Sequence, residues 1–282
     1  MSPETSDCVL RFPFKDPRWG VKLLIGSLLI LASTVVPLVP LFFVAGYSLR
    51  IIQRIIHGDG QPVLPEWDDW EWFFKHGFKL SEAGLFYALP GLVLFTAGYI
   101  MVFFPILGMS LARLATSAPQ PLSTDAMALM DQGAIVLGVA SLLTLLGAFI
   151  SVPAAMHMAS TNDVKAIFRI MEWWVILRQA SRKFILGFTW ITIAFILLMV
   201  LVTIMTVTLV LCLPATILFS VASMYLSLIA SALFAKAYRA GVEKLNGSET
   251  VVIHKVNPVS TEILADSVAK PQRKPRKPTN IL

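Results

Sequence analysis

Residues 184–211 read FILGFTWITIAFILLMVLVTIMTVTLVL and contain no charged side chain. A helix of that length rises about 42 Å at 1.5 Å per residue, whereas the hydrocarbon core of a bilayer is about 30 Å thick. The run is therefore long enough to cross a membrane as one α-helix. A helix in the core of a soluble protein has no need of so long an uninterrupted apolar stretch.

Further apolar runs repeat this signal along the chain. They cover residues 23–49, 85–112, 134–155 and 215–235. Of the 282 residues, 56% are hydrophobic and 14% are charged, whereas soluble domains usually carry about 25% charged residues. The mean hydropathy is +0.74. We therefore predict an all-α integral membrane protein, a small polytopic helical bundle, with no room for a soluble domain of useful size.

The apolar runs divide the chain into parts. Residues 1–22 are predicted to be a cytoplasmic N-terminal segment, residues 23–239 a single transmembrane domain, and residues 240–282 a disordered cytoplasmic tail rich in proline and basic residues. Within the transmembrane domain the expected elements are a proline-broken hairpin (23–56), a surface helix (65–79), two spans (83–112 and 131–158), a second surface helix (163–183) and two more spans (184–212 and 215–238).

The first apolar run allows two interpretations. Pro37 and Pro40 interrupt it midway, and one continuous helix over residues 22–56 would be about 50 Å long, well beyond the thickness of the core. If the run is a re-entrant hairpin, Arg113 is the only basic residue on the far side of the membrane. The positive-inside rule favours this arrangement, with both termini cytoplasmic. A single kinked span, which would move the N-terminal charges outside, is the alternative.

Two stretches are amphipathic when they are read as helices. Residues 65–79 and residues 163–183 each place aromatic or aliphatic side chains on one face and charged ones on the other. Pro65 suits the first helical position, and residues 160–163 offer N-caps. Because each stretch leads directly into an apolar run, we predict helices that lie on the cytoplasmic surface of the bilayer. The residues predicted at the membrane interface are Trp67, Trp70, Phe74, Phe78, Trp173 and Trp174.

Several short motifs resemble one known family. They are Phe12-Pro13-Phe14 followed by Trp19, Gly46-Tyr47 followed by Arg50 and Arg54, the LPEWDDW motif at residues 64–70, and Gly77-Phe78-Lys79. Over residues 12–80 the chain resembles the prokaryotic membrane-protein family known as domain of unknown function 4013, although Glu71-Trp72 departs from its pattern. The resemblance implies the plasma membrane of a bacterium or archaeon. It implies no activity, because none is assigned to the family.

Ionisable groups are missing where chemistry inside a membrane would need them. The apolar runs contain no Asp, Glu, Lys, Arg or His, whereas ion-coupled transporters and intramembrane hydrolases normally carry such groups at depth. The acidic residues of 66–71 fit the solvated face of a surface helix. Met156-His157-Met158 fits side-chain packing better than a metal site. We therefore predict no catalytic, cofactor-binding or metal site, and no enzyme.

The C-terminal tail carries a basic cluster formed by Arg273, Lys274, Arg276 and Lys277. The cluster lacks interleaved aromatic residues, so attraction to anionic lipid head groups, about 1 kcal/mol per basic residue, explains it better than nucleic-acid binding. The expected partners are the lipid bilayer, anionic head groups and unidentified membrane proteins, and no nucleic acid. The expected function is non-enzymatic: structural, membrane-organising or partner-scaffolding. The alternatives are a transporter or channel for a hydrophobic or uncharged solute, and an interfacial lipid-modifying enzyme.

Overall fold

The computed structural model of the protein describes residues 10–58, 61–116, 123–207 and 211–256, with the backbone alone for residues 83, 115–116 and 248–256. The chain divides into two units, residues 1–241 and residues 242–282, and the described part of the second unit is helical. The described residues form α-helices and short 3-10 helices, with no β-strand among them. The predicted all-α fold is confirmed.

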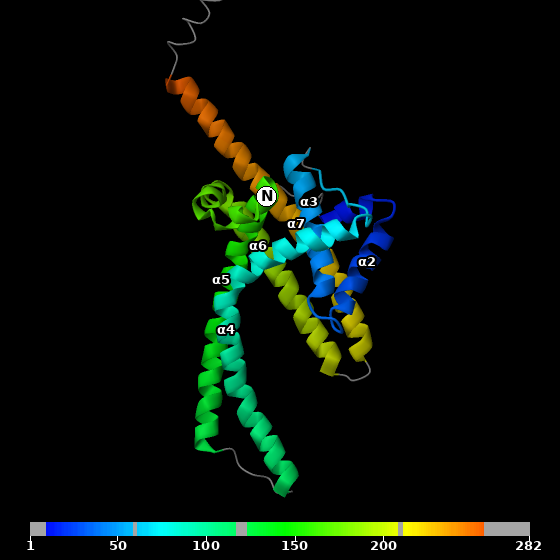
Figure 1. Ribbon diagram of the computed structural model, residues 1–282, viewed down its shortest axis with the longest axis vertical. Coiled ribbons are helices and arrows are strands. Elements are labelled where there is room, and N and C mark those ends of the chain that lie inside the picture. The colour runs from blue at the N-terminus through cyan, green and yellow to red at the C-terminus, as the bar shows by residue number, and fades with distance from the viewer. Residues whose placement is uncertain (1–9, 59–60, 117–122, 208–210, 257–282) are drawn as a thin grey trace, which may run out of the picture. The chain divides into compact units, whose positions relative to one another are not determined.

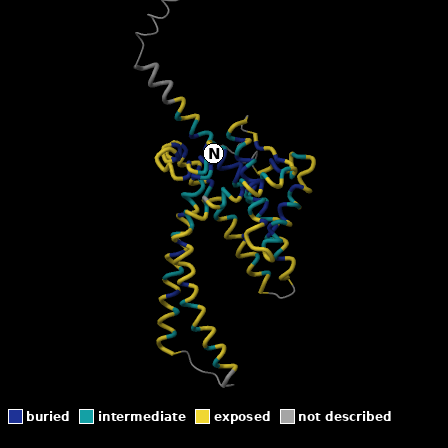
Figure 2. The backbone as a smooth tube through the Cα atoms, in the orientation of Figure 1, coloured by how far each residue is buried: buried dark blue, intermediate teal, exposed yellow. Residues whose placement is uncertain are grey.

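Five of the helices are long and apolar enough to cross a membrane. They are α3 (Val39–His57), α4 (Trp70–Thr116), α5 (Thr124–Thr161), α6 (Ile170–Val207) and α7 (Cys212–Val256) (Figure 1). In their most apolar stretches, 44% of the residues of α3 and of α7 are buried, compared with 6–11% in the other three. Helices α3 and α7 are therefore the most buried of the five (Figure 2), and the exposed apolar surface of the others fits contact with lipid. The predicted multi-pass membrane protein is confirmed.

The first apolar run folds into two antiparallel helices, α2 (Trp19–Ala32) and α3, after a short 3-10 helix, η1 (Phe12–Lys15). The chain reverses over residues 33–38, because Pro37 cannot continue the helical hydrogen bonds and Leu38 has a positive φ of 70°. Near the start of α2, Lys22 donates from Nζ to the carbonyl of Leu64, which follows α3, at 3.2 Å. The two open ends of the hairpin thus lie together (Figure 1).

The tip of this hairpin is apolar and largely exposed. Val35, Val36 and Leu38 expose 83%, 51% and 63% of their surface. The backbone N–H groups of residues 33–36 all donate to carbonyls in the last turns of α2, at 2.9–3.2 Å. Inside a bilayer every backbone donor needs an internal partner, and this turn supplies partners for these four. The tip is therefore chemically suited to hydrocarbon.

Helix α4 begins at Trp70 and not, as the sequence analysis predicted, at Pro65. An α-helix starting at Pro65 would use the carbonyls of Leu64 and Pro65 in its first turn. In the structure, Lys22 donates to the first carbonyl, and the hydroxyl of Tyr47 donates to the second at 2.9 Å. Contacts with α2 and α3 thus outcompete the local helical preference of residues 65–69.

From its first turn onward, α4 is continuous. Asp69 caps it, with a side-chain oxygen that accepts the backbone N–H three residues later at 3.0 Å. The helix passes through Pro90 and Pro105 without ending, so the predicted surface helix and the following span are one helix. Helix α5 packs alongside (Figure 1), and a Cβ on Gly98 would lie 3.1 Å from the carbonyl oxygen of Gly133. This spacing reflects close contact between the two backbones.

The second predicted surface helix, residues 163–183, is broken into pieces. A 3-10 helix, η2 (Val164–Phe168), comes first, and α6 then bends at Ala180, whose φ and ψ are −116° and 16°. A continuous helix would need the carbonyl of Ile167 for the N–H four residues later. That carbonyl instead accepts the indole N–H of Trp173 at 3.2 Å. A side-chain contact that the sequence pattern does not encode therefore breaks the helix.

Helix α7 runs on to Val256, whereas disorder was predicted from residue 240. The prediction was wrong for residues 240–256, because the first proline of the tail is Pro258 and no stronger breaker than Gly247 precedes it. Residues 257–282, which include the basic cluster, lie outside the described residues.

Candidate functional site

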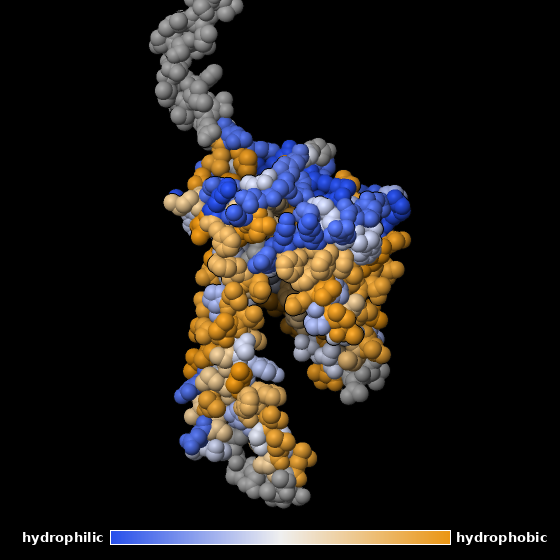
Figure 3. Space-filling model, in the orientation of Figure 1, coloured by the Kyte–Doolittle hydropathy of each residue, from blue (hydrophilic) through white to orange (hydrophobic). Residues whose placement is uncertain are grey.

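Charged residues gather at one end of the first unit, while apolar residues cover most of the long helices (Figure 3). Side chains at this end connect segments that are distant in the sequence: Arg18 pairs with Glu66 at 3.0 Å, and Gln53 donates to Asn162 at 2.6 Å. We call this region the polar layer, made of residues 11–22, 50–58, 61–79, 157–183 and 236–241. It contains the candidate functional residues.

Lys22 is buried in the polar layer although it is charged. Its side chain is 4% exposed, and Nζ lies 2.6 Å from the carboxylate of Asp16 and 2.8 Å from that of Glu66. The indole N–H of Trp67 donates to the backbone carbonyl of Lys22 at 3.1 Å. A buried ammonium group is costly unless it is paired. The ion pairs therefore fix residues 64–67 against α2, and Glu66 is committed to them.

Asp16 is held in its ionised form. Burial raises its pKa. The hydrogen bonds from the Lys22 ammonium and the backbone N–H of Arg18 lower the pKa by a larger amount, so the net pKa lies below the ordinary value. A carboxylate of this kind stabilises the fold above its ordinary pKa. The stabilisation is lost as the pH falls through the lower folded-state value. The ion pair between Asp16 and Lys22 therefore persists at neutral pH.

The aromatic residues predicted at the interface in residues 65–79 also pack on α3. Trp67 stacks on Tyr47, with ring centroids 4.2 Å apart. Three more rings contact Phe42 or Phe43 and stay 39–48% exposed; they are Trp70, Phe74 and Phe78. Helical spacing predicts these side chains on one face, but that face packs against α3. Only its outer part remains open to lipid.

The two predicted interface tryptophans of the second stretch differ. Trp173 is 2% exposed, so it packs inside the protein and not at the lipid interface where we predicted it. Trp174 is 45% exposed. Successive helical residues are turned by about 100°, so these two neighbours cannot share one face.

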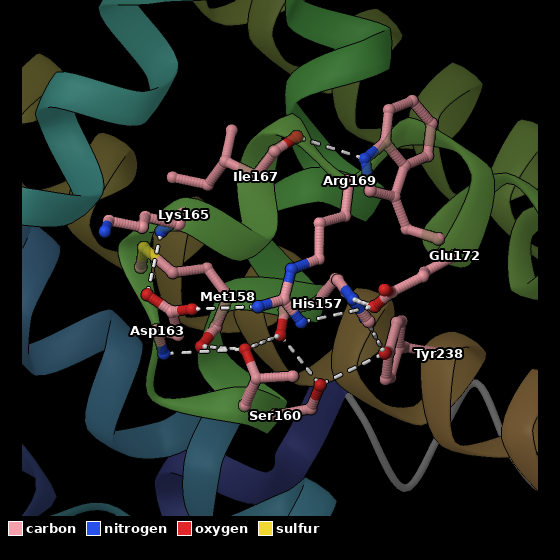
Figure 4. Close-up of polar contacts among 11 residues, drawn as sticks. His157, Met158, Ser160, Asp163, Lys165, Ile167, Arg169, Glu172 and Tyr238 are labelled. Atoms are coloured by element: carbon pink, nitrogen blue, oxygen red, sulfur yellow. Dashed lines mark hydrogen bonds and ion pairs between the residues drawn. The ribbon is translucent and has the colours of Figure 1, made fainter.

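His157 is the centre of a buried cluster that the sequence analysis attributed to packing (Figure 4). Its side chain is 8% exposed, Nδ1 lies 2.8 Å from the hydroxyl of Tyr238, and Nε2 lies 2.9 Å from the carboxylate of Glu172. The hydroxyl of Ser160 lies 3.1 Å from the same Tyr238 oxygen. The cluster joins α5, α6 and α7. No local spacing marks it, because His157 and Tyr238 are 81 residues apart.

The hydrogen bonds of this cluster can be satisfied with His157 neutral or protonated. A neutral ring donates from Nε2 to Glu172 and accepts from Tyr238 at Nδ1, while an imidazolium donates to both and Tyr238 turns to Ser160. Ser160 itself donates to the backbone carbonyl of His157 at 2.8 Å and not to the ring, so the pair is not an activated nucleophile. Among the described residues, no three His, Cys, Asp or Glu side chains gather as metal ligands would. The cluster is built to tie three helices together.

Replacing Tyr238 by phenylalanine tests whether the cluster stabilises the packing of these three helices. The variant leaves Nδ1 of His157 without its partner in a buried site, so we expect the free energy of unfolding to fall by about 1–3 kcal/mol. The loss can be measured by circular dichroism during unfolding in mixed micelles containing sodium dodecyl sulfate. Tyr99→Phe is the control, since Tyr99 is 53% exposed. Equal stability of the two variants would show that the cluster does not hold the helices.

The comparisons with known proteins agree with the resemblance drawn from residues 12–80. The family described as "Protein of unknown function (DUF4013)" matches residues 28–207, from within α2 to the end of α6. The match covers more than half of the chain, so the chain belongs to this family. Neither the curated proteins nor the solved structures provide a match.

Proposed function

We propose that this DUF4013 protein is a non-enzymatic membrane protein that inserts one side of a short helix into the cytoplasmic leaflet and so organises the lipid around it. One observation carries the proposal. The first turns of α6 lie in the polar layer, yet they expose an apolar strip, with 45–81% of each residue accessible; the strip is Ile170, Met171, Trp174 and Val175. An exposed apolar strip beside Arg169 and Arg178 is typical of a helix that lies in the head-group region.

The same helical segment is fixed to the protein from behind. Trp173, Ile176 and Leu177 are 2–8% exposed and pack inside. The bend at Ala180 separates this segment from the apolar part of α6 that follows (Figure 1). The segment thus has one apolar side for the protein and another for lipid. A helix held in this way inserts at a fixed depth.

The distribution of basic residues supports a cytoplasmic polar layer. Arginine and lysine are frequent in the polar layer, whereas Arg113 lies at the opposite end of α4. We therefore place both termini in the cytoplasm. The family resemblance supports the plasma membrane of a bacterium or archaeon.

Depth measurements on nitroxide-labelled protein test the proposal. Single cysteines replace Met171, on the apolar strip, or Gln179, which shares the exposed polar side of the helix with Glu172, in a Cys8→Ser, Cys212→Ser background. In lipid nanodiscs we expect the label at residue 171 to collide mainly with oxygen, which concentrates in hydrocarbon. The label at residue 179 should collide mainly with a water-soluble nickel chelate. Power-saturation electron paramagnetic resonance gives both accessibilities, and equal access of nickel to the two labels would contradict insertion.

A further inference from the structure

We infer that a groove in the polar layer, beside the C-terminal end of α3, binds a phosphate group. The groove is lined by Arg50, Gln53, Arg54, His57 and Gly58, and by Asn162 at the end of α5. The four polar residues of α3 are spaced i, i+3, i+4 and i+7, so they share one face of the helix. Gln53 closes one side through its 2.6 Å hydrogen bond to Asn162. This inference does not depend on the insertion of α6.

The electrostatic character of the groove is positive. Among the described residues, no acidic side chain lines the groove. Asp59 lies outside the described residues. Two carboxylates lie nearby. Asp68, with a side chain 66% exposed, contacts Arg50 at 3.3 Å, and Asp163 pairs with Arg169 at 3.3 Å. A neighbouring groove that shares Gln53 and Asn162 adds His76 and Lys79. An anion in the groove would therefore meet several cationic groups.

A simpler explanation is that these cations serve only the C-terminal end of α3, where the helix dipole favours positive charge. Another residue already serves that end: Arg239 of α7 donates to the carbonyls of Ile55 and Gly58, at 3.2 and 2.7 Å. The exposed guanidinium of Arg54 has no hydrogen-bond or ion-pair partner among the described residues. Arg239 thus already places a positive charge at this helix end, and the guanidinium of Arg54 stays available to a ligand.

The neighbouring residues suit recognition of phosphate. Arginine offers a planar fork of N–H donors that matches two phosphate oxygens. The guanidinium of Arg50 lies 4.9 Å from the ring centre of Trp72 and 5.2 Å from that of Phe73, so its position is fixed before a ligand arrives. The amide N–H groups of Asn162 add neutral donors. A phosphate therefore gains charge-assisted hydrogen bonds, and the fixed position of Arg50 lowers the cost in side-chain ordering.

Two sources could supply this phosphate: the head group of an anionic phospholipid, or a soluble phosphate compound. Both present the same oxygens to Arg54 and Arg50. The test therefore uses the purified full-length protein with two kinds of probe. Native mass spectrometry measures retention of phosphatidylglycerol against phosphatidylcholine from mixed micelles, and a thermal-shift titration in phosphatidylcholine nanodiscs measures binding of glycerol 3-phosphate and of inorganic phosphate.

The variant Arg54→Gln, His57→Gln removes two exposed side chains of the groove and leaves the contacts of Arg50 and Arg239 in place. It also removes the 3.4 Å contact between Nε2 of His57 and the carbonyl of Ala159. We expect it to bind whichever probe the wild type binds about tenfold more weakly, the equivalent of losing one charge-assisted hydrogen bond. Arg11→Gln is the matched control, since Arg11 is an exposed arginine of the polar layer that neither lines the groove nor borders the apolar strip of α6. It should bind as the wild type does. Unchanged circular dichroism shows that the variants are folded.

The outcomes separate the source of the phosphate from the existence of the site. Selective loss of phosphatidylglycerol retention identifies a lipid head group, and selective loss of the thermal shift identifies a soluble phosphate. If the wild type binds neither probe, or if Arg11→Gln weakens binding as much as the groove variant, the inference is overturned. An equal loss in the control would show that surface charge alone attracts the anion.

Discussion

Alanine in place of Gly77 is expected to drive α3 and α4 apart and to reduce the free energy of unfolding by about 3 kcal/mol or more. A Cβ at Gly77 would overlap the carbonyl oxygen of Phe42 and lie 2.6 Å from the backbone nitrogen of Gly46. Gly46 is restricted in the same way, because its Cβ would overlap the carbonyl oxygen of Phe73. Overpacked side chains cost about 1–3 kcal/mol. Here the obstacles are backbone atoms, which cannot rotate away, so the upper end of that range is the minimum.

The control for this prediction is Gly84→Ala, seven residues later in the same helix. A Cβ at Gly84 would meet no heavy atom within 4 Å. Alanine is more favourable than glycine in a helix by about 1 kcal/mol, so this variant should be as stable as the wild type or slightly more stable. Helical circular dichroism during unfolding in mixed micelles measures both variants. Equal stability of Gly77→Ala and Gly84→Ala would mean that the two helices do not pack as described.

Cysteine labelling should give an all-or-none result for the α2–α3 hairpin. A cysteine at Val36, in the apolar tip, is expected to resist a membrane-impermeant maleimide both on intact cells and after the cells are opened. Helix α2 has 14 residues, or about 21 Å, so it is shorter than a hydrocarbon core of about 30 Å. The tip, joined to so short a helix, is therefore expected to end inside the bilayer. Detergent should make the cysteine reactive.

Three further positions calibrate this experiment, all in the Cys8→Ser, Cys212→Ser background. A cysteine at Asp125, at the start of α5, should label on intact cells. Cysteines at Gln61 and Ser181, which both belong to the polar layer, should label only after the cells are opened. Labelling of residue 36 on intact cells would show that the hairpin crosses the membrane completely. Labelling of residue 61 or 181 on intact cells would reverse the orientation of the whole protein.

The sequence was sufficient for the long helices because lipid imposes a simple rule. A run such as residues 184–211 is too apolar for water, and as a helix it satisfies all its backbone hydrogen bonds within hydrocarbon. The break near Pro37 was also visible, because proline removes a donor. The start of α4 could not be predicted, because the carbonyl of Pro65 accepts a hydrogen bond from the hydroxyl of Tyr47, 18 residues earlier in the chain. Helix boundaries in the polar layer depend on such distant contacts.

The polar residues were harder to interpret from sequence than the apolar ones. Lys22 has the position of an interface charge in the sequence, yet it is buried between Asp16 and Glu66. His157 has no charged neighbour within four positions in sequence, and its partners come from α6 and α7. Hydropathy indicates whether a segment prefers water or lipid. It does not indicate which distant segment supplies the hydrogen-bond partner of a buried polar side chain.

The contacts of Tyr238 and Arg239 have a consequence for biosynthesis. Arg239 donates to carbonyls 184 and 181 residues earlier in the chain, and α7 is the last described helix to leave the ribosome. Until α7 is made, the end of α3 lacks this donor, and the ring of His157 lacks the hydroxyl of Tyr238. A chain that ends before α7 therefore lacks the partners of these groups at its polar end. Translation of the final helix is the step that closes the protein.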